Sequence, residues 1–205
     1  MTGEPLSDRD LFDAWCEGDR KAGHALFSRH FASIRRFFAN KVDDDVEELV
    51  QRTFTACIEG RDRFSRRSSF RTYLFGIARN KLREHFRSRH RGATPLDDVS
   101  VVDMGAGVST VITERREQRL LLEALRRIPL EHQMLLELYF WENLSASEIG
   151  EIFDAPENTV RSRIRRGKQL VGEQLASLTS SARELESTLG NLEGWAESLR
   201  LRVAR

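Results

Sequence analysis

The sequence predicts an all-α fold: two small helical domains joined by a flexible linker, with a helical C-terminal tail. Apolar residues recur at every third or fourth position along most of the 205 residues, the spacing of amphipathic helices. Strand-type alternation is absent, and the segment 92–113 combines glycine, proline, serine and aspartate without an apolar stripe. We therefore expect a first domain at residues 1–91, a linker at 92–113, a second domain at 114–172 and a tail at 173–205.

Composition excludes several classes of protein. The sequence shows neither a signal peptide nor a run of about 18 apolar residues, so we expect a cytoplasmic protein without a membrane span. Cys16 and Cys57 are isolated from each other, as expected of two buried thiols in a reducing compartment. The sequence carries no metal-binding motif, no nucleophile motif and no phosphate-binding loop. These patterns predict a protein that is not an enzyme and that needs no cofactor.

The net charge of +1 conceals a strong segregation of charge along the chain. Residues 61–91 contain eleven Arg or Lys against two acids, and residues 161–168 contain five bases and no acid. Residues 43–48 contain five acids and no base. Charge that is concentrated by sign indicates partners of the opposite sign, and two basic segments favour nucleic acid over a merely solvated surface.

In the first domain, apolar spacing predicts helices over residues 11–15, 22–38 and 46–58, with Gly60 ending the third. The apolar residues at helical spacing include Phe31 in the second helix and Ile58 in the third. A fourth helix is expected to begin after Ser68 or Ser69 and to run to about residue 88. Its predicted buried stripe consists of Phe70, Tyr73, Leu74, Ile77 and Phe86. Its arginines lie mostly elsewhere on the helical wheel, so this helix should dock by an apolar side and present bases outward.

The second domain contains a pattern typical of a helix-turn-helix. Ser145 is a predicted N-cap, and Glu148 completes a capping box. The residues "DAPE" form a predicted tight turn, and Pro156 suits the start of the next helix. That helix should bury Val160, Ile164 and Val171. Its other face then presents a polar and basic set: Asn158, Arg161, Ser162, Arg165 and Arg166. Such side chains can bind phosphates or base edges in a major groove, and a helical hairpin that does not bind DNA is the alternative.

Three stretches resemble the bacterial RNA polymerase sigma factors of the extracytoplasmic-function (ECF) group. "DDDVEELVQRTF" is similar to the acidic part of region 2, and "DRFSRRSSFRTYLFGIARNKLREHFR" to its promoter-reading part. "LRRIPLEHQMLLELYFWENLSASEIGEIFDAPENTVRSRIRRGKQL" is similar to region 4. With the helices that precede them, these stretches span residues 11–175 in the family's order. Two departures are Arg52, where the family often has an acid, and Asp154, which replaces a common glycine in the helix-turn-helix.

The resemblance implies a promoter-specificity subunit that binds core RNA polymerase and promoter DNA. By this likeness, a docking surface for the β′ clamp coiled coil comprises Asp45, Glu47, Glu48, Leu49 and Gln51. The loop 64–69 would form a pocket for a flipped base of the −10 element. The residues implied for the −10 element are Phe64, Ser68, Ser69, Tyr73, Arg79, Asn80, Arg83 and Arg87. Those implied for the −35 element are Asn158, Arg161, Ser162, Arg165 and Arg166.

The tail exceeds the family pattern and carries apolar residues in alternating steps of four and three from Val171 to Val203. Three interpretations remain open: added core on the protein's own domains, a regulatory contact that keeps the domains closed, or a coiled coil with another chain. An anti-sigma factor or the tail itself is the candidate inhibitor. The alternative function is a stand-alone helix-turn-helix repressor or activator that is dimerised by the heptads.

Overall fold

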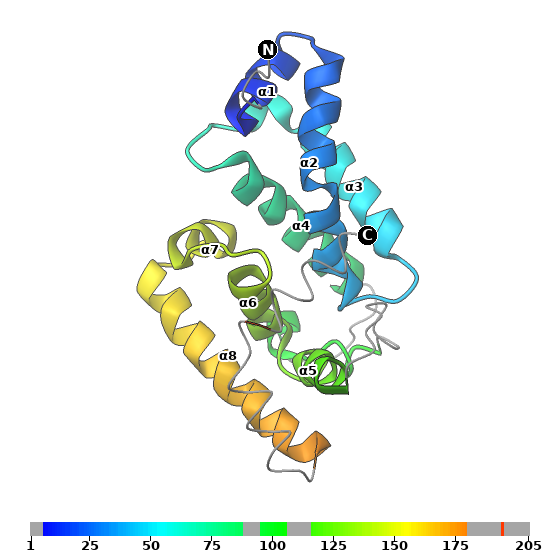
Figure 1. Cartoon of the computed structure of the whole chain (residues 1–205), viewed down its shortest axis with the longest axis vertical. Coiled ribbons are helices and arrows are strands. Elements are labelled where there is room, and N and C mark those ends of the chain that lie inside the picture. The colour runs from blue at the N-terminus through cyan, green and yellow to red at the C-terminus, as the bar shows by residue number, and fades with distance from the viewer. Residues whose placement is uncertain (1–5, 88–94, 106–115, 180–193, 195–205) are drawn as a thin grey trace.

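The fold is given by a computed structural model, which places residues 6–87, 95–105, 116–179 and 194. Over these residues the chain forms eight α-helices and two short 3-10 helices, and one isolated bridge pairs Ser100 with Pro129 (Figure 1). The predicted all-α class is confirmed. Among the same residues, no helix combines the length and the apolar character that a membrane span requires.

The first domain consists of α1 (Asp8–Cys16), α2 (Arg20–Ala39), α3 (Val46–Glu59) and α4 (Phe70–Arg87). Short polar side chains fix the starts of these helices. The Ser7 hydroxyl accepts a hydrogen bond from the backbone N–H of Asp10, and the Asp19 carboxylate accepts two in the first turn of α2. At the start of α4, the Ser69 hydroxyl accepts a hydrogen bond from the backbone N–H of Thr72 at 3.0 Å, so Ser69 is the N-cap.

The apolar stripe of α4 is rotated and wider than the sequence predicts. The buried side chains include three that were not in the predicted stripe: Phe75, Ala78 and Leu82. Tyr73 and Ile77, which the sequence places in the stripe, are only half-buried. The difference arises because α4 packs against α2 and α3 within its own domain and also against α7 (Figure 1).

The second domain consists of α5 (Arg116–Arg126), α6 (Leu130–Phe140), α7 (Ala146–Phe153) and α8 (Glu157–Leu178). The predicted capping box at the start of α7 is confirmed, since Ser145 and Glu148 exchange hydrogen bonds. Asp154 ends α7 in the left-handed conformation with φ of 51°, as expected of a residue that replaces glycine in this turn. Helices α7 and α8 therefore form the predicted helix-turn-helix.

The part of the predicted linker that the structure describes, residues 95–105, is folded against both domains. A 3-10 helix at Leu96–Asp98 contacts α4 and α6, and Val101 is fully buried. The backbone of Val99 accepts a hydrogen bond from Leu130 N at 3.0 Å. The connection between the domains is therefore ordered over this stretch.

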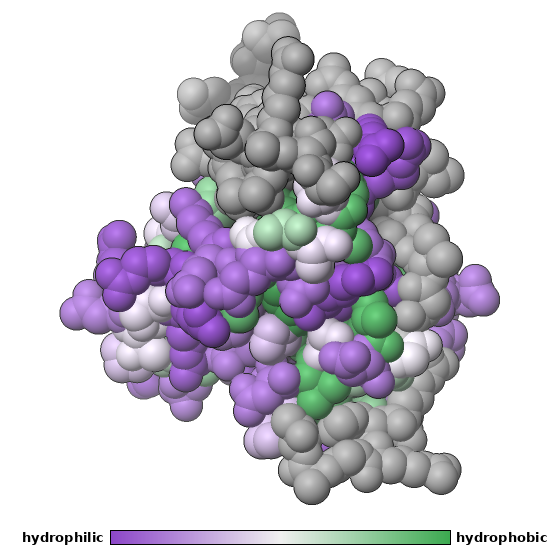
Figure 2. Space-filling model, turned by 90° about the horizontal axis from the view of Figure 1, so that it is seen from below, coloured by the Kyte–Doolittle hydropathy of each residue, from purple (hydrophilic) through white to green (hydrophobic). Residues whose placement is uncertain are grey.

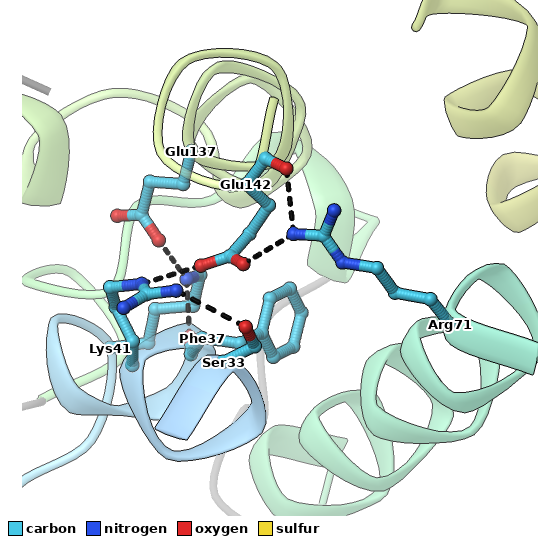
Figure 3. A network of polar contacts seen from close by, with 7 residues as sticks. Ser33, Phe37, Lys41, Arg71, Glu137 and Glu142 are labelled. Atoms are coloured by element: carbon cyan, nitrogen blue, oxygen red, sulfur yellow. Dashed lines mark hydrogen bonds and ion pairs between the residues drawn. The ribbon is translucent and has the colours of Figure 1, made fainter. Parts of the chain in front are cut away.

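Buried polar contacts join the two domains along α2 and α6 (Figure 3). Glu142 follows α6 and lies between two cations of the first domain, with Arg36 Nε at 2.5 Å and Arg71 at 2.7 Å. Lys41 lies just after α2 and forms an ion pair with Glu137 of α6. The side chains of Arg36, Lys41, Glu137 and Glu142 are all at most 6% exposed. Because these charges are shielded from water, their pairing ties the domains in one specific arrangement.

The predicted heptad stripe begins inside the second domain. Val171 and Leu175 of α8 are buried, where α8 packs on α5 and α6. Helix α8 ends at Leu178, six residues beyond the predicted end of the domain at residue 172. The heptad residues from Ala182 to Val203 lie outside the described residues. Seen from below the orientation of Figure 1, the described part of this face is mostly hydrophilic, with small hydrophobic areas between hydrophilic residues (Figure 2).

Candidate nucleic-acid and protein interfaces

The acidic cluster lies at the start of α3, where carboxylates also complement the positive end of the helix dipole. Glu47 and Glu48 are each 64% exposed, and each pairs with an arginine of the same domain. Gln51 is exposed on the next turn, and Asp45 is half-buried. Leu49, which the sequence analysis assigned to the same docking surface, is 0% exposed. Leu49 is therefore a core residue in this structure, because it lies on the face of α3 that packs inward.

An apolar patch, which the sequence analysis missed, lies on α2 and α3 of the same domain. Phe31 is 45% exposed and Ile58 is 52% exposed, although both belong to the apolar residues that recur at helical spacing. The ring of Phe31 stacks on that of Phe54, with centroids 6.2 Å apart and an interplanar angle of 9°. Exposed large apolar side chains beside charged ones are typical of protein-binding surfaces. Helical spacing placed these residues on an apolar stripe. It could not show that the neighbouring helices cover only part of that stripe.

The loop 64–69 forms one wall of a cavity of about 330 Å³, and α1 forms the opposite wall. The cavity is lined by Ser7, Asp8, Arg9, Phe12, Phe64, Arg66, Ser68, Ser69 and Phe70. The ring of Phe64 stacks on Tyr73 with centroids 4.6 Å apart. Aromatic walls with hydroxyls and guanidinium groups near them suit an unstacked base and its backbone. The contribution of α1 was not predicted, because no local pattern shows that α1 lies across from this loop.

The shape of this loop depends on contacts with α1. Arg66 has a left-handed backbone, with φ of 59°, which is uncommon for a residue other than glycine. Its guanidinium lies 2.6 Å from the Asp13 carboxylate and over the ring of Phe12. The ion pair and the cation–π contact hold the loop against α1 and so maintain the cavity.

The basic face of α4 is divided between exposed and occupied side chains. Asn80 and Arg87 are exposed. Arg83 pairs with Asp97 at 3.0 Å, and Arg79 lies 3.8 Å from the same carboxylate. Burial lowers the pKa of Arg79, although Asp97 beside it favours the charged form.

A second cavity of about 360 Å³ lies between α4 and α7. Tyr73, Arg79 and Asn80 of α4 line one side, and Glu151 and Ile152 of α7 line the other. The structure thus brings these three predicted −10 residues together. It also places Ser68 at the edge of both cavities, so the two form neighbouring parts of one surface.

The five residues that the sequence assigned to the −35 element are all exposed on the outer face of α8: Asn158, Arg161, Ser162, Arg165 and Arg166. Glu157 accepts two hydrogen bonds from the guanidinium of Arg161, at 2.9 and 2.6 Å, which orients that side chain. The Ser162 hydroxyl donates to the backbone of Thr159. The opposite face of α8 is anchored in the domain through Val160 and Ile164. The geometry is that of a recognition helix whose polar and basic face is exposed, with Arg161 and Arg166 paired to acids of the same helix.

Comparison with known proteins agrees with this geometry. The family model described as Sigma-70 region 2 matches residues 26–92, and that described as Sigma-70, region 4 matches residues 118–171. Together the two matches cover more than half of the chain. The ECF RNA polymerase sigma-E factor of Haemophilus influenzae is 27% identical over 186 residues, which cover 85% of this chain and 98% of that protein. The chain is an ECF sigma factor. The sigma-E factor of Escherichia coli K12 is 28% identical over the same share of this chain and 97% of its own length.

Two solved structures share the fold of this sigma factor. CnrH in complex with the cytosolic domain of CnrY has a TM-score of 0.61 and 24% identity, covering 84% of this chain and 99% of that one. The sigma factor RpoE of Bartonella quintana, in complex with the anti-sigma factor NepR, has a TM-score of 0.58 and 21% identity, covering 77% and 97%. Sigma factors give RNA polymerase its promoter specificity and act as initiation factors.

Proposed function

We propose that this ECF sigma factor binds core polymerase through α3, captures a melted −10 strand with α4 and the loop 64–69, and reads the −35 element with α8. The observation that carries the proposal is the placement of the −35 residues. All five lie exposed on one face of the second helix of a helix-turn-helix, in a chain that also matches region 2. A stand-alone repressor or activator would leave region 2 without a role.

The docking surface for the β′ clamp coiled coil is proposed to comprise Asp45, Glu47, Glu48 and Gln51, together with the apolar patch of Phe31, Phe54 and Ile58. The acids provide complementarity to a basic partner helix, which increases the rate of association and sets its orientation. The apolar side chains provide area that loses contact with water on binding. Leu49 supports this surface from beneath, since it is buried.

At the −10 element, the cavity between α1 and the loop 64–69 is proposed to receive a flipped base. Capture of an unstacked base offsets part of the cost of opening the duplex, which is about a few kcal/mol per base. Tyr73, Asn80 and Arg87 then hold the adjacent strand, joined by Arg79 and Arg83 when these are released from Asp97.

In-vitro transcription with core RNA polymerase and fragmented genomic DNA tests the proposed function. The full-length protein is expected to direct initiation at a defined set of promoters that share −35 and −10 sequences. The double variant Glu47→Lys/Glu48→Lys should lose core binding in a pull-down while keeping its helical circular dichroism. Glu17→Lys, an exposed reversal at the end of α1, is the matched control and should bind core normally. Failure of the unaltered protein to bind core would contradict the proposal.

Regulation by a partner or by the tail is a further part of the proposal. CnrH and the B. quintana RpoE were solved with CnrY and with an anti-sigma factor, respectively, and we propose that a cytoplasmic inhibitor of this kind, or residues 180–205, restrains this protein too. A tail truncation should end after Thr179 and not at Gly172, because Leu175 is part of the core. Higher transcription from the truncated protein would support the tail as inhibitor, and unchanged transcription would contradict it.

A further inference from the structure

The proposed −10 surface on α4 and the proposed −35 surface on α8 lie too close together to bind one promoter at the same time. The −10 and −35 elements are numbered by position along the promoter, so they lie about 25 base pairs apart, which is about 85 Å of straight duplex. In the structure, α7 packs across α4, and α8 begins at Glu157, directly after the turn that ends α7 (Figure 1). Helix α7 contacts both α4 and α8, so the helices that carry the two surfaces have a single helix, about 10 Å in diameter, between them. The domains must separate before both elements can be bound.

In this closed arrangement, an acid from the connecting segment occupies the arginines of α4. Asp97 lies in the 3-10 helix at Leu96–Asp98, between the matched regions 2 and 4. Its carboxylate is 3.0 Å from Arg83 and 3.8 Å from Arg79, and its side chain is 19% exposed. A carboxylate and a phosphate present similar anionic oxygens to a guanidinium. Asp97 therefore takes the place that a DNA phosphate would take on these two side chains.

Helix α7 also covers Arg79. The guanidinium of Arg79 lies over the ring of Phe153, 4.5 Å from its centroid, and the Arg79 side chain is 15% exposed. Glu151 lines the cavity opposite Tyr73 and Asn80. A strand that enters this cavity would meet a carboxylate, so the closed arrangement disfavours DNA by charge as well as by space.

The contact of Asp97 with Arg79 leaves polar atoms of both residues unsatisfied. Oδ1 of Asp97 and Nε of Arg79 are buried without a hydrogen-bond partner among the described residues. Buried groups that are left unsatisfied make an ion pair less favourable. A nucleic-acid phosphate that satisfies these arginines fully therefore competes with Asp97 for them, most directly for Arg83, whose side chain is 30% exposed.

We propose that the closed arrangement is autoinhibitory: Asp97 and α7 occupy Arg79 and Arg83 of the free sigma factor, and binding to core polymerase releases them by separating the domains. This inference rests on the proposed role of α4 in −10 binding. It identifies the connecting segment as a regulator of that surface, in addition to a spacer between the two domains.

The test compares Asp97→Asn with Asp98→Asn in the free, full-length protein. Both variants lose one negative charge from the same 3-10 helix, but Asp98 is exposed and is not the carboxylate beside Arg79 and Arg83. The probe is a fluorescein-labelled single-stranded DNA 20-mer of mixed sequence, and binding is followed by fluorescence anisotropy. We expect Asp97→Asn to bind about three- to tenfold more tightly than Asp98→Asn and the unaltered protein. Equal affinities of the two variants would overturn the inference.

Transcription with core polymerase separates this inference from the proposed function. With core present, Asp97→Asn and the unaltered protein should initiate at similar levels, because core has already released the arginines. A lower activity of Asp97→Asn in the holoenzyme would show that Asp97 assists initiation, which contradicts the inhibitory role. If neither protein supports initiation while Asp97→Asn still binds the 20-mer more tightly, the proposed function fails and the intramolecular contact stands.

Discussion

Lys41 and Glu137 form an ion pair that is completely enclosed between the two domains. Their side chains are 0% and 2% exposed, and Glu137 also accepts hydrogen bonds from Asn40 and Gln133. Burial lowers the pKa of Lys41, while the nearby Glu137 carboxylate favours its charged form. The two residues are 96 positions apart in the sequence, so this pair exists only because the domains meet.

Removal of one partner of this pair should be costly. Lys41→Met leaves the Glu137 carboxylate buried without its cation, so we expect a loss of about 3–5 kcal/mol in the free energy of unfolding, measured in urea. The double variant Lys41→Met/Glu137→Leu should recover much of that loss. As a control, Arg127→Met breaks an exposed pair with Glu123 and should change stability by less than about 1 kcal/mol. If the losses in unfolding free energy of Lys41→Met alone and Glu137→Leu alone added up to the loss of the double variant, the coupling between the two residues would be contradicted.

The exposed arginine that Glu157 orients should determine promoter selection. Arg161→Ala is expected to weaken binding to a −35 duplex by about 1–3 kcal/mol if Arg161 contacts a base edge, and to relax the preference for that base. The measurement is a competition assay with duplexes that vary one base pair at a time. If Arg161 contacts only phosphate, all duplexes lose affinity alike, and base reading by this residue is ruled out.

The two cysteines should react very differently with thiol reagents. Burial raises the pKa of Cys57 to about 12, so at pH 8 only about one thiol in ten thousand is the reactive thiolate. Cys16 is only half-buried. We expect Cys16 to be labelled under native conditions and Cys57 only after denaturation, as followed by mass spectrometry. Prompt native labelling of Cys57 would show that α3 opens readily.

Mild acid should weaken the packing of α6 on α8 through His132. Nδ1 of His132 donates a hydrogen bond to the backbone oxygen of Arg163 at 3.1 Å, and burial lowers the pKa of the imidazole. A His pKa that is lower in the folded state means that the unfolded state binds more protons as the pH falls below about 6.5. Stability is therefore retained above this pH and lost below it.

Thermal unfolding between about pH 7.5 and 5.5 should show this loss in the unaltered protein and a smaller loss in His132→Gln, which can still donate a hydrogen bond but does not titrate. Parallel pH profiles of the two proteins would show that His132 is not the group responsible.

Two helical glycines should respond in opposite directions to alanine. A Cβ at Gly150 would lie 2.5 Å from the backbone oxygen of Ala155 in the helix-turn-helix, so we expect Gly150→Ala to destabilise by about 1–3 kcal/mol. A Cβ at Gly76 in α4 would meet no atom within 4 Å, so Gly76→Ala should stabilise by about 0.5–1 kcal/mol. Urea denaturation of both variants provides the measurement. Equal effects would mean that helical propensity alone governs both sites.

Features that depend on neighbouring residues could be predicted from the sequence. The capping box of Ser145 and Glu148, the left-handed Asp154 and the end of α3 at Gly60 all depend on contacts within about one helical turn. The exposed basic face of α8 follows in the same way, because helical periodicity places the bases opposite the buried Val160 and Ile164.

The sequence by itself determined the helices, their caps, the segregation of charge and the face of α8 that meets solvent, because each is set by spacing along one helix. Only the tertiary structure decided that Leu49 is buried and that Phe31 and Ile58 are exposed. It also decided that α1 completes the cavity at the loop 64–69 and that Asp97 pairs with Arg83. The physical reason is that an amphipathic pattern shows which side of a helix is apolar. It does not show how much of that side a distant segment covers, nor which charge a distant segment brings to the other side.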